Sequence, residues 1–395
     1  MKKIYLTINW LISSILSFLP TKMNYIIFES YPDFDGSPKK IYDEFIRRNV
    51  QKKFRLVWAV DKSQRSLSSQ YDVIVSFGRG TIFERIKKKW ALMHAKLIVD
   101  SNRFVWKLNP RTRRLYTQHG SALKKMSAYS NEIGSVDYVL SISDEMKKIE
   151  SDFEYTSLKE TNVEFLVLGH PFDDALFEKK DLYKIGFWTK CLGNEHRFKK
   201  IIGWMPTYRN HKQSSNSVYK RTFPVGVPLL NSEKDLDALN ELLEKNDVLL
   251  TVQIHHAQVN EFPQKNYSNI ILLHHELNVE FDVTLANLLQ SFDALITDYS
   301  SIYYEFLLLN RPVALSIDDY EEYQETYGFL VDYFDLIKGV YLKDTSDLVH
   351  FIEDVANDVD SAKDEREKSL HRIHKYVDGQ STKRVVDFLI EKAKL

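Results

Sequence analysis

The stretch ALITDYSS (residues 294–301) decides how this sequence folds. Its first four residues form an apolar run typical of a buried strand, and a helix is predicted to begin near Ser300 and to continue to Leu309. A strand that runs directly into a helix leaves backbone N–H groups unpaired at the positive end of that helix. The adjacent hydroxyls of Ser300 and Ser301 therefore predict a phosphate site; the alternative is that either serine only caps the helix.

Strand-like and helix-like segments alternate along most of the chain. Short apolar runs of strand character occur at residues 25–28, 54–60, 73–75, 97–100, 115–118, 138–141, 165–168, 200–205, 248–254, 270–273, 294–297 and 312–316. Such alternation predicts parallel sheets with helices on both faces. The pattern weakens across residues 173–200, a charged and mainly helical stretch, so we expect two doubly wound halves that join near residues 173–187. Active sites in such sheets lie beyond the carboxyl ends of the strands.

The length of 395 residues and the hydrophobic content of 44% suit two domains with full cores. We expect an α/β fold of the GT-B kind: two doubly wound parallel-sheet, Rossmann-like domains, at residues 21–175 and 176–395, facing a cleft. The last helix is expected to be able to pack back on the N-terminal domain. A net charge of −1 gives no argument for a nucleic-acid partner. The single cysteine, Cys191, excludes an internal disulfide framework, and no Cys/His spacing predicts a metal site.

The first 20 residues have an apolar stripe at helical spacing, formed by Ile4, Ile8, Leu11, Ile12, Ile15 and Leu19. The segment is short for a membrane span and carries Thr, Asn and Ser, and it has no small-residue cleavage site. We therefore expect an amphipathic helix that lies either on a bilayer or on the N-terminal domain. Basic residues at 87–89 and 111–114 would then face anionic lipid; a solvated helix face is the alternative.

Several short polar motifs stand at the predicted strand ends. They are ES (29–30), QHGSALKK (118–125), GHP (169–171), MPTYR (205–209), QIHH (253–256) and TDYSS (297–301). Their order and spacing resemble the CDP-glycerol glycerophosphotransferase family, the teichoic-acid primases and polymerases that are also found in capsule pathways. LLNRPV (308–313), YGF (327–329) and DGQS (378–381) extend the resemblance over nearly the whole chain.

The resemblance implies a GT-B-like fold and the transfer of an alditol phosphate from a CDP-alditol, with release of CMP. The implied acceptor is a hydroxyl of a lipid-linked saccharide or of a growing polyol-phosphate chain, at the cytoplasmic face of the membrane. The enzyme would be peripheral there, on an anionic membrane surface. The resemblance implies no cofactor, and it leaves a divalent metal open. We predict glycerol phosphate as the transferred group and CDP-glycerol as the donor, with CDP-ribitol as the nearest alternative.

Two histidines are the predicted catalytic residues. The family segment Trp-His-Gly-Thr-Pro-Leu-Lys carries a catalytic histidine that matches His119, although Gln118, Ser121 and Ala122 depart from it here. A base that deprotonates an alcohol needs a pKa near neutrality, which suits imidazole. The family's Lys-Leu-His-Pro matches QIHH (253–256) and implies that His255 donates to a phosphate oxygen as CMP departs.

The donor diphosphate is assigned to residues that follow two strands. Thr207 and Arg209 would bind it with a hydroxyl and a guanidinium fork, and Ser300 and Ser301 would hold it at the helix start. A salt bridge is the alternative for Arg209. Asp298 belongs to the same site, but a carboxylate repels a diphosphate. It could orient an Arg or a His, receive a hydroxyl, or carry a metal.

The acceptor side is assigned to Glu29 and Ser30, which end the first predicted strand, and to Lys124. Besides the CDP-ribitol enzyme, two other kinds of protein remain as alternatives. A GT-B glycosyltransferase that uses a nucleotide sugar would favour a Glu-x₇-Glu spacing in the donor loop, which this sequence lacks. An inactive membrane scaffold would fit the departures from the family pattern, and the two histidines argue against it.

Overall fold

A computed structural model of the protein describes residues 22–62, 70–77, 80–102, 105–118, 120, 123–125, 136–155, 162–207, 209, 221, 223–254, 262–263, 265–273 and 280–395. Two compact units divide the chain. Unit 1 comprises Met1–Ser121, Ser127–Asp174 and Lys375–Leu395, and unit 2 comprises Ala122–Met126 and Ala175–His374. The helix predicted at residues 1–20 lies outside the described residues.

Unit 1 is built on a seven-stranded parallel sheet of order β3-β2-β1-β4-β5-β6-β7. Its strands are β1 (Tyr25–Phe28), β2 (Arg55–Asp61), β3 (Val73–Phe77), β4 (Ala95–Asp100), β5 (Arg113–Tyr116), β6 (Tyr138–Ser141) and β7 (Glu164–Val167). The order reverses between β1 and β4, and such a point is where ligands bind in doubly wound sheets.

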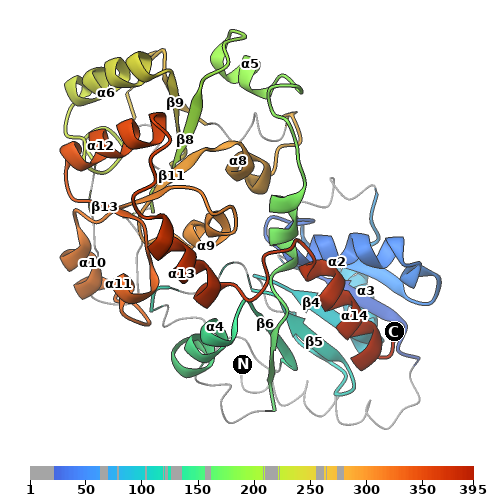
Figure 1. The fold of residues 1–395 in the computed structure, drawn as a ribbon. Coiled ribbons are helices and arrows are strands. Elements are labelled where there is room, and N and C mark those ends of the chain that lie inside the picture. Colours follow the sequence, from blue (N-terminus) through green and yellow to red (C-terminus); the bar gives the residue numbers. More distant parts are fainter. Residues whose placement is uncertain are drawn as a thin grey trace. The chain divides into compact units, whose positions relative to one another are not determined.

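Helices cover both faces of this sheet. They are α2 (Gly36–Arg47), α3 (Ile82–Met93), α4 (Asp144–Ile149) and α14 (Ser381–Lys392), with the short turns η1 (Val50–Lys52), η3 (Glu150–Glu154) and η5 (Pro171–Phe177) near the strand ends. Successive strand residues point to opposite faces, so Ile26 and Phe28 join a core with α2 and α14, whereas Ile27 joins a core with α3. Figure 1 shows α2 and α14 side by side, although they come from opposite ends of the chain.

Unit 2 repeats the plan with a six-stranded parallel sheet of order β10-β9-β8-β11-β12-β13. Its strands are β8 (Lys200–Trp204), β9 (Val248–Val252), β10 (Ile270–Leu272), β11 (Ala294–Thr297), β12 (Val313–Ser316) and β13 (Val340–Leu342). Its helices are α5 (Phe187–Leu192), α6 (Glu233–Asn246), α8 (Leu285–Ser291), α9 (Ile302–Leu307), α10 (Tyr320–Thr326), α11 (Tyr333–Leu336), α12 (Thr345–Ala356) and α13 (Lys363–Ile373).

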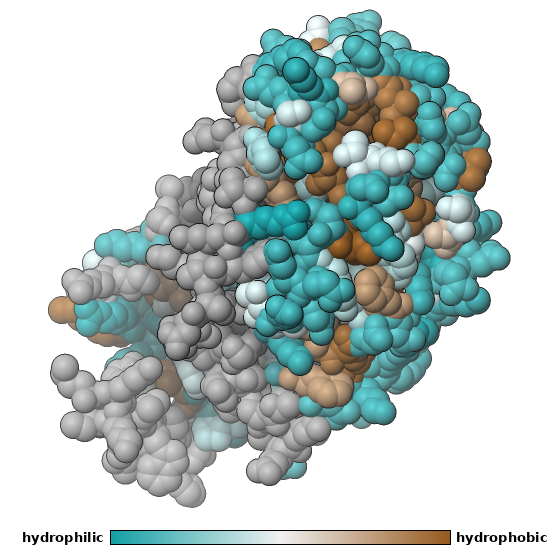
Figure 2. All heavy atoms as spheres, turned by 90° about the vertical axis from the view of Figure 1, so that its left-hand side faces the viewer, coloured by the Kyte–Doolittle hydropathy of each residue, from teal (hydrophilic) through white to brown (hydrophobic). Residues whose placement is uncertain are grey.

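The core of unit 2 joins α6 and α12 to one face of the sheet. Leu236, Leu239 and Leu243 of α6 pack with Phe351 and Ile352 of α12 on the inward side chains of the strands. The opposite sides of these helices meet solvent, as expected for amphipathic helices. In the view of Figure 2, hydrophilic residues cover most of the described surface, and apolar residues form patches between them.

Most predicted strands appear within two residues of their expected bounds, including β11 over all four of its residues. Three features differ from the expectations. Before β8 begins at Lys200, the stretch from residue 173 contains only the short helix α5 besides the turn η5, because Gly186 and Gly193, both with positive φ, bound that helix. The strand β13 was not predicted, since its three residues give no readable period. The helix predicted from Ser300 to Leu309 spans only Ile302–Leu307.

The ends of the two units also differ from the expected domain bounds. Residues 375–395, placed in the second domain by the sequence, belong to unit 1, where Val385, Val386 and Leu389 of α14 are fully buried in its core. Residues 122–126, placed in the first domain, belong to unit 2. The packing of the last helix on the N-terminal domain was among the expectations, whereas the place of residues 122–126 was not, because tertiary contacts decide it.

Candidate active site

Two strand ends meet at the point where the order of the unit 2 sheet reverses. Thr207 follows β8, and Asp298 directly follows β11, the neighbouring strand. The backbone N–H of Thr207 donates to both carboxylate oxygens of Asp298, at 3.0 and 2.9 Å. The Thr207 hydroxyl donates to Asp298 Oδ1 at 2.6 Å. Below them, Thr297 Oγ1 donates to the carbonyl of Met205 at 2.8 Å, so the two strand ends are held together.

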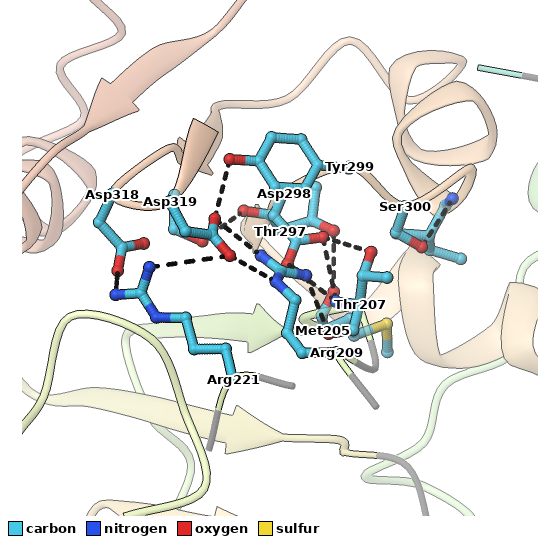
Figure 3. Close-up of polar contacts among 12 residues, drawn as sticks. Met205, Thr207, Arg209, Arg221, Thr297, Asp298, Tyr299, Ser300, Asp318 and Asp319 are labelled. Atoms are coloured by element: carbon cyan, nitrogen blue, oxygen red, sulfur yellow. Dashed lines mark hydrogen bonds and ion pairs between the residues drawn. The ribbon is translucent and has the colours of Figure 1, made fainter. Parts of the chain in front are cut away.

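Arg209 lies between two carboxylates, as Figure 3 shows. Its Nη1 is 2.8 Å from Asp298 Oδ2, and its Nε and Nη2 donate to Asp319 at 2.7 and 3.3 Å. Its Nη1 also donates to the carbonyl of Thr207 at 3.0 Å. The side chains of Arg209, Asp298 and Asp319 are all fully buried. Burial alone would lower the pKa of Arg209, but Asp298 and Asp319 outweigh it and hold that pKa well above its ordinary value.

Aromatic rings enclose the same guanidinium. Its central carbon lies 4.9 Å from the ring centroid of Tyr299, 5.1 Å from that of Tyr323 and 5.7 Å from that of Phe223. The hydroxyl of Tyr299 donates to Asp319 Oδ1 at 2.9 Å. Every nitrogen of Arg209 thus has an oxygen partner inside the protein. The geometry favours the salt-bridge alternative over an open fork for diphosphate, although the bridge is buried rather than on the surface.

These contacts also select among the roles considered for Asp298. Its carboxylate orients Arg209 and closes the turn at Thr207, which is the first of the three alternatives. Within the part of the chain that the structure describes, no group of three or more metal-ligating side chains comes together. Asp319, its main partner in holding Arg209, was missed from the sequence. The sequence contained one signal for Asp319. Asp318 and Asp319 follow the predicted strand at residues 312–316, and Asp298 follows the predicted strand before it, at residues 294–297.

Lys124 reaches this cluster from a distant part of the sequence. The segment 123–125 pairs with residues 328–330: Lys124 forms an antiparallel bridge with Phe329, and the N–H of Lys125 donates to the carbonyl of Gly328 at 3.2 Å. The Lys124 ammonium lies 5.8 Å from the ring centroid of Tyr323. Burial lowers the pKa of Lys124 to about 8; Asp298 opposes this shift and Arg209 adds to it. Lys124 was assigned to the acceptor side, but the structure places it beside the Asp298 cluster.

The two serines differ in how their hydroxyls are used. Ser300 Oγ accepts from the N–H of Ile302 at 3.4 Å, whereas Ser301, the N-cap residue of α9, makes no side-chain capping bond. Both residues are partly exposed. The Ser300 hydroxyl therefore makes only a long capping hydrogen bond, and the Ser301 hydroxyl makes none.

A cavity of about 420 Å³ lies next to the cluster. Its lining includes Arg221, which is paired with Asp318 at 2.6 Å, and Lys343 and Thr345 beyond the end of β13. This volume is in the range of small-molecule sites. The same edge of the unit 2 sheet thus carries both the charged cluster and an open space.

The residues assigned to the acceptor lie in unit 1. Glu29, fully buried at the end of β1, accepts from the N–H groups of Ser101 and Asn102 at 3.3 and 3.2 Å. The hydroxyl of Ser30 donates to the carbonyl of Pro32 at 2.7 Å. Glu29 thus holds the loop that follows β4, whereas Ser30 holds the loop that follows its own strand, β1. The predicted catalytic residues, His119 and His255, lie outside the described residues, as does His256.

The two sheets define the class of protein. Each has the strand order of a doubly wound nucleotide-binding fold, and the charged cluster lies at the switch point of the second. Solved structures show the same GT-B-like fold. The wall teichoic acid polymerase TagF matches with a TM-score of 0.69 at 19% identity, over 100% of this chain and 95% of that one. A UDP-GlcNAc 2-epimerase from Methanocaldococcus jannaschii matches with a TM-score of 0.53 at 13% identity, over 93% and 99%.

The chain belongs to the CDP-glycerol:poly(glycerophosphate) glycerophosphotransferase family, whose model matches residues 11–391. A teichoic acid poly(glycerol phosphate) polymerase of Bacillus spizizenii is 27% identical over 95% of this chain and 94% of its own length. A teichoic acid glycerol-phosphate transferase of Staphylococcus aureus is 24% identical, over 94% of both chains. A teichoic acid poly(ribitol-phosphate) polymerase of B. spizizenii is 25% identical, over 94% of this chain and 57% of its own length.

The family, the α/β GT-B-like fold and the enzyme class predicted from the sequence are therefore confirmed. The protein is thus an enzyme of this glycerophosphotransferase family. Within the described residues, no helix is both long and apolar enough to cross a bilayer.

Proposed function

We propose that this enzyme transfers glycerol phosphate to a hydroxyl of a lipid-linked saccharide or of a growing polyol-phosphate chain. The acceptor oxygen attacks the glycerol-bearing phosphorus of CDP-glycerol, the bond from that phosphorus to the bridging oxygen breaks, and CMP leaves with the bonding electrons. The hydroxyl proton passes to His119. Such a reaction depends on positioning and on charge stabilisation more than on covalent catalysis.

The position of Lys124 is the single observation that carries the proposed donor site. The Arg209 guanidinium is neutralised by Asp298 and Asp319, so it supplies little charge to a diphosphate. The Lys124 ammonium makes no hydrogen bond or ion pair with the described residues, and it lies beside that cluster at the switch point. We assign the diphosphate to Lys124 together with the Ser300 and Ser301 hydroxyls, and we assign to Arg209, Thr207 and Asp298 the positioning of the two strand ends.

The remaining roles follow from the family motifs. His119 acts as the base, and His255 donates to the phosphate oxygen that gains charge as CMP leaves. Four residues separate His119 from Lys124 in the sequence, which links the proposed base to the proposed phosphate contact. The identity of the alditol is the most specific part of the proposal, since relatives of both the glycerol and the ribitol kind match this chain.

Release of CMP tests the proposal. Purified protein is incubated with a lipid-linked acceptor and with labelled CDP-glycerol, CDP-ribitol or UDP-sugars in separate reactions. We expect acceptor-dependent CMP release from CDP-glycerol, and we expect His119→Ala to abolish turnover while donor affinity stays within about tenfold. Release only from CDP-ribitol would change the assigned alditol. Near-normal turnover in the His119 variant would remove that residue from the mechanism.

An exposed apolar stripe on α3 supports the proposed location at the cytoplasmic face of the membrane. Ile82, Phe83, Ile86 and Trp90 are exposed by 71, 84, 58 and 54%. At 3.6 residues per turn, these four residues fall within an arc of about 100° on the helix. Lys87 and Lys89 flank that arc on its two sides, and Ala91 and Leu92 bury the opposite face. An apolar stripe between lysines suits an anionic bilayer surface.

Sedimentation with anionic phosphatidylglycerol vesicles tests this location. We expect the double variant Phe83→Ser/Trp90→Ser to lose most of its vesicle binding at unchanged thermal stability, whereas Phe177→Ser, at an exposed aromatic residue elsewhere, keeps it. Deleting residues 1–20 tests the predicted N-terminal helix separately. Full binding by the double variant would assign the membrane contact to another part of the chain.

A further inference from the structure

Lys124 lies against the end of α10, and both belong to unit 2. The N–H groups of Tyr327 and Gly328 donate to the carbonyl of Tyr323 at 2.9 and 3.4 Å, which closes the last turn of this helix. Gly328 has a φ of +67°, the left-handed conformation in which helices commonly end. The chain is thereby turned so that Phe329 forms its antiparallel bridge with Lys124.

Backbone hydrogen bonds fix Lys124 on both of its sides. The N–H of Leu330 donates to the carbonyl of Leu123 at 3.0 Å. The N–H of Lys125 donates to the carbonyl of Gly328 at 3.2 Å. Leu123 and Leu330 are both buried, so this short pairing is anchored in the interior of the unit. The end of α10 therefore sets the backbone position from which the Lys124 side chain extends.

Two cations lie over the ring of Tyr323. The Lys124 ammonium is 5.8 Å from the ring centroid, and the central guanidinium carbon of Arg209 is 5.1 Å from it. The negative face of an aromatic ring attracts a cation within about 6 Å of the centroid. Tyr323 is buried and stacks on Tyr299, with 4.1 Å between the two centroids, so the position of its ring is fixed by packing.

The carboxylate nearest to this ammonium in its electrostatic effect is already engaged. Asp298 binds the hydroxyl of Thr207 and the guanidinium of Arg209. Burial lowers the pKa of Lys124, Asp298 opposes this shift from a distance, and Arg209 adds to it. Burial also raises the pKa of Tyr323, whose hydroxyl therefore stays neutral. A carboxylate in direct contact would hold the ammonium and cancel its charge, whereas a neutral ring holds it and leaves the charge in place.

We propose that Tyr323 is a positioning residue of the donor site, whose ring holds the Lys124 ammonium beside the Asp298 cluster without neutralising it. The charge then remains available to an anionic phosphate group. Tyr323 acts only through Lys124, a role that rests on the proposed contact between Lys124 and the donor diphosphate.

Ring variants at position 323 separate attraction to the ring from simple packing. Tyr323→Phe keeps the aromatic face. A phenylalanine with three ring fluorines at this position keeps nearly the same shape, but the fluorines withdraw the negative charge from the face. Tyr323→Leu removes the ring. Phe334→Leu removes a ring of the same unit that contacts Tyr333 and Tyr341 instead, and it serves as the control.

The pKa of Lys124 is the readout that does not depend on any ligand. It is measured by NMR from the ε-carbon resonance in protein labelled with [ε-¹³C]lysine, with the resonance assigned by Lys124→Arg. We expect the fluorinated ring to lower this pKa by about half a unit relative to Tyr323→Phe, because the charged form loses the attraction of the ring. Phe334→Leu should leave it unchanged.

Affinity for CDP-glycerol, measured by calorimetric titration at pH 7, is the second readout. We expect Tyr323→Leu to bind about fivefold more weakly and Tyr323→Phe to restore the affinity. In a protein that already carries Lys124→Met, Tyr323→Leu should cause little further loss, because both substitutions act on the same contact.

A Lys124 pKa that does not respond to fluorination would overturn the inference, and so would equal losses of affinity for Tyr323→Leu with and without Lys124→Met. If Tyr323→Leu does not fold, the fluorinated ring still decides it. If fluorination lowers the pKa but CDP-glycerol neither binds nor releases CMP, the proposed function fails and the role of Tyr323 in holding Lys124 stands.

Discussion

Two clusters of acidic side chains in this enzyme are stabilised in opposite ways. In unit 2, the carboxylates of Asp298 and Asp319 enclose the guanidinium of Arg209, and all three side chains are fully buried. In unit 1, Glu150 is equally buried beside Glu154, and no cation pairs with either acid within the described residues. The first cluster keeps its charges because they compensate one another. The second is expected to keep a proton because burial raises the pKa of both acids and no cation pairs with them in the part of the chain that the structure describes.

The difference between the two clusters depends on the groups around each acid and not on the unit in which the acid lies. Unit 1 also contains a fully buried ion pair, in which Arg114 Nη2 lies 2.8 Å from Asp100 Oδ2. Burial raises the pKa of Asp100, and Arg114 opposes that shift. A guanidinium within hydrogen-bonding distance thus offsets part of the cost of burying a carboxylate, and each cluster predicts a different response to mutation and pH.

The largest effect is expected on the free energy of unfolding, when the paired cluster of Arg209, Asp298 and Asp319 loses one of its carboxylates. Asp319→Ala leaves the buried Arg209 without one of its two counterions, and breaking a buried pair in this way costs about 3–5 kcal/mol. Thermal and urea unfolding should show the loss. Asp237→Ala, which removes the partner of the exposed Lys265, should change the unfolding midpoint little. Equal effects of the two substitutions would contradict the distinction between buried and exposed pairs.

In the cluster of Glu150 and Glu154, removing an acidic side chain should increase the stability instead of lowering it. Because burial raises the pKa of Glu154 from 4.5 to about 7, the native state binds a proton that the unfolded state has lost between these pH values. Stability due to this group therefore falls as pH rises from 4.5 to 7, by up to about 3 kcal/mol. Glu154→Gln should remove that slope and be more stable than the natural protein at pH 8. Unfolding midpoints between pH 5 and pH 8 measure the difference, and parallel curves would refute it.

Lys124 extends the comparison to ligand binding, since its ammonium lies beside the paired cluster and has no ion pair among the described residues. Because burial lowers the pKa of Lys124 to about 8, its charge is present at pH 7 and mostly lost at pH 9. Affinity for CDP-glycerol should fall about tenfold over this range, and Lys124→Arg should resist that fall. Lys124→Met should bind about tenfold more weakly at pH 7, and Lys125→Met should bind normally. Calorimetric titration with CDP-glycerol at both pH values measures these affinities.

The smallest effects are expected at the two serines of the strand-to-helix turn. Ser300→Ala removes the bond to the N–H of Ile302 and should cost at most about 1 kcal/mol of stability. Ser301→Ala removes no capping bond, so we expect unchanged stability and a loss of several-fold in affinity for CDP-glycerol. If Ser301→Ala is less stable but binds normally, its hydroxyl is structural and not part of the proposed donor site.

Sequence reasoning predicted the strands better than the side-chain partners. The apolar run at residues 294–297 located β11 correctly, and the motifs after β8 and β11 indicated that Thr207, Arg209 and Asp298 belong together. It did not predict that Arg209 is enclosed by carboxylates, because Asp319 is 110 residues away in the sequence. It regarded Gln118 as a departure from the family pattern, whereas the structure gives this side chain two hydrogen-bond partners.

The sequence alone determined the family, the alternation of strands and helices, and the strand ends where polar motifs gather. These properties are local, since they depend on residue order and on the period of apolar side chains. Tertiary structure alone decided which charges are neutralised, which acid stands without a counterion, and that the segment carrying Lys124 joins unit 2. The energy of a buried charge depends on neighbours within a few ångströms, and the fold brings those neighbours from distant parts of the chain.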